Sequence, residues 1–212
     1  MKVLTDLNNG LAFLHRGEFK EFLFRLKVYF KKIDLSYASA DTLGLSAERS
    51  HAYADSGGTH LEKILNHLNI TKEDSIVDFG SGKGGALITF ARYPFFKIMG
   101  VELLPELVAI AHKNLKILRI STVTMVVSDA AHVTDLNEYT HFYFYSPFPR
   151  NVMADVIGNL ETSLRLKPRK ITIIYCNPEF HDCIVTDTRF SKTNEFHHNR
   201  LHHPVYLYSN KP

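Results

Sequence analysis

The sequence predicts one α/β domain built on a mostly parallel β-sheet that ends in an antiparallel hairpin. Two observations lead to this fold class. From residue 75 onward, short runs rich in β-branched and aromatic residues alternate with helical patterns, which is typical of parallel strands joined by crossover helices. Near the C-terminus two β-rich runs follow each other with no long helix between them, so an antiparallel pair is expected there. A length of 212 residues suits one such domain.

The first expected element is a helix over residues 16–35. Apolar residues recur there three and four positions apart, and lysines and arginines lie mostly on the other side, so the helix is amphipathic, basic and rich in aromatic side chains. Packing on the domain is the favoured interpretation; a substrate lid, a dimer contact and attachment to a membrane surface are alternatives. Residues 36–58, rich in small polar side chains, then form a connecting lid segment. We therefore divide the chain into an N-terminal helix with its lid segment, 1–58, and the α/β domain, 59–212.

A second helix, starting in "THLEKIL" with Ser56 or Thr59 placed to cap it, leads into the sheet. The runs that predict parallel strands are 75–79, 97–103, 122–129, 140–146 and 170–177. Apolar residues at helical spacing predict helices between them near 84–93, 105–118, 131–138 and 150–165. The runs "TRFSKTNEFHH" and "HPVYLYS" supply the two strands of the hairpin.

Composition and charge narrow the class of protein. No apolar run approaches the roughly 20 residues that cross a bilayer, and the N-terminus lacks the pattern of a signal peptide, so a cytoplasmic location is expected. The net charge of +3 is concentrated at the two ends, which allows a nucleic-acid partner but does not favour one. Cys176 and Cys183 are expected to be free thiols. The histidine run at 197–203 is interpreted as a solvated loop, so no metal site is expected. A monomer and a homodimer both remain open.

The stretch "SIVDFGSGKGGAL", residues 75–87, contains two overlapping glycine patterns. One spells G-x-G-x-x-G and ends at Gly85, as in dinucleotide-binding loops, whereas the other spells D-x-G-x-G-x-G and begins at Asp78. A carboxylate beside the loop would repel a pyrophosphate, which binds at a helix N-terminus. S-adenosylmethionine has no phosphate and carries two positive charges, an α-ammonium and a sulfonium. Asp78 therefore favours S-adenosylmethionine as the cofactor.

Two more carboxylates end the next two strands. Glu102 follows the glycine loop at a spacing suited to accept hydrogen bonds from both ribose hydroxyls, although nicotinamide enzymes place an acid there too. Asp129 ends the third strand, where it can accept the adenine amino hydrogen while the N–H of Ala130 meets a ring nitrogen. Ligands of open α/β sheets bind at the carboxyl edge of the strands. Three carboxylates at that edge predict one cofactor site.

The run "DSIVDFGSGKGGALITFARYPFFKIMGVELLPELVAIAHKNL" resembles the cofactor-binding half of class I S-adenosylmethionine-dependent methyltransferases. Residues 53–180 are similar to a bacterial group whose glycine loop is like that of Dot1-type histone-lysine methyltransferases. The resemblance implies a Rossmann-like, seven-stranded sheet with an antiparallel final hairpin, and makes 59–212 the methyltransferase domain. It also implies a set of cofactor-binding residues: Asp78, Gly80, Ser81, Gly82 and Gly84 around the amino-acid end, Glu102 and Leu103 at the ribose, Asp129 and Ala130 at the adenine, and Tyr53 and Thr59 over the methionine moiety.

The acceptor is expected at the end of the fourth strand, in "YSPF", 145–148. Amino-methylating relatives carry [NDS]-P-P-[FYW] there, so Tyr145, Ser146, Pro147 and Phe148 are the candidate catalytic residues. Ser146 lacks the two-sided geometry of a carboxamide, which puts methylation of a base amine in doubt. Tyr145, His132 and His181 are candidate bases, and Tyr175 points toward the same edge. We expect a methyltransferase whose acceptor is a protein amine or a small molecule; the alternative is a non-catalytic S-adenosylmethionine-binding module that acts through protein or RNA contacts.

Overall fold

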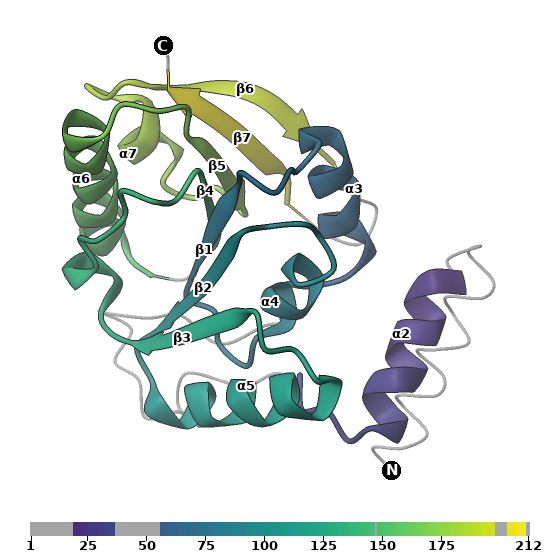
Figure 1. Cartoon of the computed structure of the whole chain (residues 1–212). Coiled ribbons are helices and arrows are strands. Elements are labelled where there is room, and N and C mark those ends of the chain that lie inside the picture. The colour runs from purple at the N-terminus through teal and green to yellow at the C-terminus, as the bar shows by residue number, and fades with distance from the viewer. Residues whose placement is uncertain (1–18, 37–55, 147, 198–202, 211–212) are drawn as a thin grey trace.

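The computed structural model describes residues 19–36, 56–146, 148–197 and 203–210 (Figure 1). Its centre is a seven-stranded sheet in the order β3-β2-β1-β4-β5-β7-β6. The first five strands are parallel, and β7 is antiparallel to both β5 and β6. The predicted fold class, with its C-terminal hairpin, is confirmed. The strands are β1 Ser75–Phe79, β2 Lys97–Glu102, β3 Val123–Val127, β4 His141–Tyr145, β5 Thr172–Cys176, β6 Phe190–Phe196 and β7 Val205–Asn210.

Helices cover both faces of the sheet (Figure 1). One face packs against α3 Thr59–Leu68, α4 Gly85–Phe90 and α5 Pro105–Leu118. The other face packs against α6 Arg150–Leu166 and α7 His181–Val185. Because the crossover from β1 to β2 and the connection from β4 to β5 use opposite faces, the chain reverses its direction of winding between β1 and β4. Such a switch point leaves room for a ligand at the carboxyl edge.

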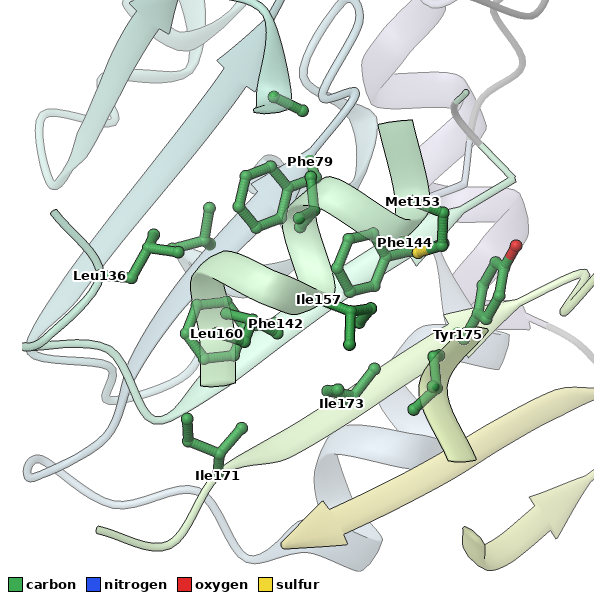
Figure 2. Close-up of a cluster of buried hydrophobic side chains, with 14 of the residues drawn as sticks. Phe79, Leu136, Phe142, Phe144, Met153, Ile157, Leu160, Ile171, Ile173 and Tyr175 are labelled. Atoms are coloured by element: carbon green, nitrogen blue, oxygen red, sulfur yellow. The ribbon is translucent and has the colours of Figure 1, made fainter. Parts of the chain in front are cut away.

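The aromatic residues that fill the α6 face lie directly beneath that edge (Figure 2). Phe79 ends β1, and its ring stacks on Phe144 of β4 at 5.3 Å between centroids and 6° between planes. Both rings are buried, and Phe142, Met153 and Ile157 surround them. Burial of each such side chain stabilises the fold by about 1.5–3 kcal/mol. The glycine loop, which follows Phe79, therefore starts from a rigid base.

Two local expectations are wrong. Residues 131–138 do not form a helix; only the short 3-10 helix η2, Ala130–His132, is present. The carbonyls of Leu136 and Tyr139 accept hydrogen bonds from the guanidinium of Arg169, at 2.7 and 2.8 Å, and this side chain therefore holds the loop in a non-helical path. The N-cap of α3 is Gly58, in place of Ser56 or Thr59, and no side chain caps that helix.

The N-terminal helix α2, Phe19–Phe30, lies within the predicted span 16–35. It stands to one side of the domain in Figure 1. The chain that follows it returns to the domain, where Ile33 and Leu35 are buried against Ile88 of α4 and Leu115 of α5. Among the helices of the described residues, none is both long enough and apolar enough to span a bilayer.

Candidate functional site

The sheet register brings the ends of β1, β2 and β4 together. Asp78 in β1 pairs with Gly100 in β2 and with Tyr143 in β4. One residue later, Phe79 pairs with Val101 and Phe144. The glycine loop, the end of β2 and the "YSPF" turn therefore leave the sheet at the same level. This is the edge at which the cofactor and the acceptor are expected.

The backbone of the glycine loop distinguishes the two overlapping patterns. Gly80, Gly82 and Gly84 all have positive φ, at 76°, 51° and 84°, whereas Gly85 is an ordinary first residue of α4. Residues with a Cβ rarely adopt such angles. The loop thus uses the glycines of the D-x-G-x-G-x-G pattern. A different glycine is required by close packing: a Cβ on Gly57 would lie only 2.4 Å from the carbonyl oxygen of Gly85, so the chain before α3 passes very close to the start of α4.

Asp78 is buried on the α3 and α4 face, with 2% of its surface exposed. Within the described part of the chain no hydrogen bond reaches its carboxylate. Burial, and then the negative charge of Glu102, raise the pKa of Asp78 well above its usual value. A buried carboxylate without a donor is costly unless a positive group pairs with it. A ligand ammonium beside the glycine loop would supply that partner.

The carboxylate of Glu102 links the end of β2 to the glycine loop. Its Oε2 accepts a hydrogen bond from the N–H of Gly82 at 2.8 Å, and its Oε1 accepts one from Leu104 at 3.0 Å. Burial raises the pKa of Glu102, and the hydrogen bonds from the Leu104, Gly82 and Leu103 backbone oppose that rise. Glu102 therefore fixes the shape of the loop in this structure. Its predicted contact with a ribose stays a prediction, as does the role of Leu103.

The third strand-end carboxylate acts as a cap. Asp129 precedes η2, and its Oδ1 accepts a hydrogen bond from the N–H of Ala131 at 3.0 Å. Ala130 is buried at the start of η2, next to the α6 face. This geometry fixes the turn after β3 at the same edge as Glu102. The adenine contacts of Asp129 and Ala130 stay predictions.

Ser81 and Thr59 are two further candidates for cofactor binding. The Ser81 side chain points toward Gly100 of β2. Its Oγ lies so close that a Cβ on Gly100 would be only 2.9 Å from it. This oxygen is buried and has no hydrogen-bond partner among the described residues. The N–H of Ser81 donates to Val101, and its carbonyl accepts from Gly84. Thr59 is the first residue of α3. Tyr53 and Pro147 lie outside the described residues.

Sequence reasoning missed a polar cluster that joins the glycine loop to α5 and to the segment after α2. Lys83 is 5% exposed, and its Nζ lies 3.0 Å from Asp34 Oδ1 and 3.1 Å from Ser36 Oγ. Asn114 of α5 donates to the carbonyls of Asp34 and Lys83 at 2.9 and 3.0 Å, and its Oδ1 accepts from the N–H of Asp34. This cluster joins the segment that follows α2 to the loop. A lysine inside a glycine loop, normally solvated, gives no sequence signal for such a role.

At the acceptor edge, Ser146 and Asn177 directly follow β4 and β5. Both are non-glycine residues with positive φ, at 39° and 52°. The Oγ of Ser146 donates to Glu179 Oε2 at 3.4 Å. Tyr175, at the rim of the core cluster in Figure 2, also hydrogen-bonds with Ser146, and burial raises its pKa to about 12. Sequence reasoning missed Glu179, although "NPEF" after β5 repeats the polar-Pro pattern of "SPFP" after β4.

The other acceptor candidates are placed differently. Phe148 is buried and packs edge-on against Phe144 at 6.1 Å, so its ring lies in the core in this structure, and its catalytic role stays a prediction. The hydroxyl of Tyr145 lies 3.2 Å from Nε2 of His203. His181 bonds through Nδ1 to the hydroxyl of Tyr208 at 2.9 Å. Of the predicted acceptor residues, Ser146 is the one whose described contacts form a polar cluster at the edge with Tyr175 and Glu179.

Comparison with known proteins identifies the family. The sequence model of protein-L-isoaspartate(D-aspartate) O-methyltransferase (PCMT) matches residues 7–141, which is more than half of the chain. The chain belongs to the PCMT family. It is a class I S-adenosylmethionine-dependent methyltransferase. The matched segment contains the glycine loop, Glu102 and Asp129, and it ends before Ser146 and Glu179.

Other relatives agree on the enzyme class. An uncharacterized RNA methyltransferase of Chlamydia muridarum is 30% identical over 121 residues, which are 56% of this chain and 29% of that protein. A second, from Halalkalibacterium halodurans, is 26% identical and is matched over 26% of its length. The chain thus spans less than a third of these curated relatives. The crystal structure of an RNA methyltransferase from Salinibacter ruber, in complex with S-adenosyl-L-homocysteine, has 16% identity and a TM-score of 0.54 over 71% of this chain and 90% of that one. A putative methyltransferase from Escherichia coli, yhhF, has 19% identity and a TM-score of 0.58 over 74% and 89%.

The residues at this edge fit S-adenosylmethionine. The buried Asp78 carboxylate, which receives no hydrogen bond from the described residues, is a partner for a cation. The three positive-φ glycines make a close approach of a ligand to the backbone feasible. When bound, the cofactor supplies an activated methyl group, and the protein has to bind it, orient the acceptor and exclude water.

Proposed function

We propose that this methyltransferase acts on RNA. The support from relatives is that two of them, matched over 56% and 55% of this chain, are named RNA methyltransferases. This proposal replaces the protein amine or small molecule favoured on sequence alone, which becomes an outcome of the test. The likeness to Dot1-type enzymes stays a prediction that rests on the glycine loop, and the cytoplasmic location and the oligomeric state also stay predictions.

The observation that carries the proposal is the basic segment that is tied to the glycine loop. Lys27, Lys31 and Lys32 are exposed at the end of α2 and in the turn after it, and the ring of Phe30 is 75% exposed beside them. Exposed cations with an aromatic ring suit phosphates and stacked bases. The Lys83–Asp34 ion pair fastens this segment to the loop after β1, so an RNA bound there would be held next to the cofactor edge.

In the proposed mechanism the protein positions two partners. Asp78 pairs with the ammonium of the cofactor, the glycine loop contacts its amino-acid end, and Glu102 holds the loop and accepts from the ribose. Ser146 and its neighbours face the acceptor. Placement of the two reacting groups in a site shielded from water accounts for most of the rate enhancement that such a transfer needs.

Incubation of the full chain with tritium-labelled S-adenosylmethionine and fractionated lysate, from cells in which the gene is deleted, tests the proposal. Label is expected in the RNA fraction; label confined to protein or to small molecules would refute it. Lys31→Glu should weaken RNA binding about threefold to tenfold, because one phosphate contact is lost. For the same reason the RNA affinity should depend less steeply on salt concentration. Lys170→Glu is the matched control, since Lys170 is exposed just before β5, at the opposite edge of the sheet. Equal effects of the two substitutions would remove the support from α2.

A further inference from the structure

The turns after β4 and β5 form a second polar site next to the cofactor edge. Tyr145 and Cys176 are the last paired residues of the two strands, so Ser146 and Asn177 leave the sheet side by side. Both have positive φ, which is uncommon for residues with a Cβ. The N–H of Glu179 donates to the carbonyl of Asn177 at 2.8 Å. The second turn thereby carries Glu179 back toward Ser146.

The polar atoms of this site are mostly hydrogen-bond acceptors. Ser146 uses its one proton to donate to Oε2 of Glu179, at 3.4 Å. A hydroxyl has two lone pairs, so Ser146 Oγ keeps one of them for a further donor beside its hydrogen bond with Tyr175. No hydrogen bond from the described residues reaches Oε1 of Glu179. The turn therefore presents two acceptor atoms from neighbouring strands, whereas a carboxamide at position 146 would present one acceptor oxygen and one donor nitrogen.

We propose that Ser146 and Glu179 together bind a nitrogen acceptor through its N–H groups, and that Glu179 takes the acceptor's proton. An amine with two N–H bonds can donate to both oxygens at once, which turns its lone pair away from them and toward the methyl group. A hydroxyl has one proton and cannot make both bonds. This inference concerns the acceptor atom and does not depend on whether RNA is the molecule that carries it.

The same site disfavours the acceptor that the family name implies. The isoaspartyl acceptor of the PCMT reaction is a carboxylate, and Glu179 would place a second negative charge beside it. The family match also ends at residue 141, before either turn begins. An acceptor carbon would need an added nucleophile such as a thiolate. Cys176 is buried, and burial raises its pKa strongly. Burial also raises the pKa of the half-buried Cys183, so both cysteines stay thiols.

The transfer balances without a further reactant. The lone pair of the acceptor nitrogen forms the new bond to the methyl carbon. The electron pair of the broken carbon–sulfur bond stays on sulfur, which neutralises the sulfonium. The nitrogen then carries one proton too many, and this proton passes to Glu179 and on to solvent. Glu179 touches the acceptor in this scheme, so it is a catalytic residue.

The chemical form of the transferred label tests the inference wherever the label is found. Labelled RNA and protein are digested and separated against N-methyl, ribose O-methyl and C-methyl standards, and methyl esters are detected by their release in mild alkali. A synthetic peptide with one L-isoaspartyl residue is incubated in parallel. N-methyl product and an unlabelled peptide are expected. Methyl esters, ribose O-methyl or C-methyl products would overturn the inference, and so would a complete lack of label. The identity of the labelled fraction tests the RNA proposal separately.

Substitutions at the turn test the role of Glu179. Glu179→Gln should lower kcat about 100-fold, with little change in the affinity for S-adenosylmethionine measured by calorimetric titration. Glu179→Asp, which keeps the carboxylate, should recover part of the loss. Asp182→Asn is the matched control, because Asp182 lies three residues further on and forms an exposed pair with Arg150. Unchanged kcat in Glu179→Gln, or an equal loss in Asp182→Asn, would contradict the proposal. Retained cofactor affinity shows that a variant is folded.

Discussion

Replacement of Asp78 by asparagine should change stability and cofactor affinity in opposite directions. Its carboxyl has a pKa well above 3.8 in the folded protein, because it is buried and faces Glu102. As the pH rises above 3.8, the unfolded chain loses this proton and the folded protein does not, so the free energy of unfolding decreases. At pH 7 the decrease cannot exceed about 4 kcal/mol, at 1.36 kcal/mol for each pH unit above 3.8. Asparagine does not titrate, so Asp78→Asn removes this loss.

We expect the free energy of unfolding of Asp78→Asn at pH 7 to exceed that of the wild type by about 1–4 kcal/mol, since asparagine resembles the protonated carboxyl in shape and is free of the loss that comes from titration of the unfolded chain. The melting temperature should rise by about 2–4 °C for each kcal/mol. The gain should be nearly lost near pH 4, where the folded carboxyl is protonated and the unfolded one is close to half protonated. Affinity for S-adenosylmethionine should fall more than tenfold, because its ammonium loses the carboxylate.

Thermal unfolding without cofactor at pH 7 and pH 4, together with calorimetric titration, checks both effects. Asp74→Asn is a matched control at the other end of β1. Burial acts to raise the pKa of Asp74, but hydrogen bonds from Thr71 and Thr140 and the nearby His141 outweigh it, so its pKa is lowered. Asp74→Asn should therefore destabilise the protein and leave cofactor affinity unchanged. A melting temperature of Asp78→Asn below that of the wild type at pH 7, or unchanged cofactor affinity, would refute the reasoning.

Three other changes have definite expected outcomes. Lys83→Met should lower the free energy of unfolding by only about 1–2 kcal/mol, because Asp34 is half exposed and regains water. Without the ion pair, trypsin should cut faster after Lys32, and an unchanged cutting rate would contradict the anchoring role of Lys83. Burial lowers the pKa of His141 to about 4 from 6.5, so the free energy of unfolding should fall by about 3 kcal/mol as the pH drops across that window. In His141→Gln, the free energy measured by urea unfolding should depend less on pH over the same window. Gly57→Ala should reduce both stability and cofactor affinity, because the new Cβ would lie 2.4 Å from the Gly85 carbonyl; a wild-type melting temperature would argue against that close packing.

Local patterns in the sequence were sufficient for most of the fold. β-Branched and aromatic runs predicted the strands to within one or two residues, because a strand buried on both faces must be apolar throughout. The helix at 105–118 was predicted with both ends correct. The error at 131–138 has a tertiary cause. Arg169 is distant in the sequence, and its guanidinium binds the carbonyls of this loop in place of helical N–H groups.

The sequence by itself determined the cofactor, because the glycine register and Asp78 are adjacent along the chain and their chemistry excludes a pyrophosphate. Only the tertiary structure decided which groups surround that site. Lys83 pairs with a residue 49 positions earlier, and Ser146 meets a carboxylate 33 positions later. Parallel strands joined by long crossovers bring such residues together at one edge, and the spacing of nearby residues in the sequence does not predict these contacts. For the same reason the turn "SPFP" predicted Ser146, while its partner Glu179 emerged from the register of β4 and β5.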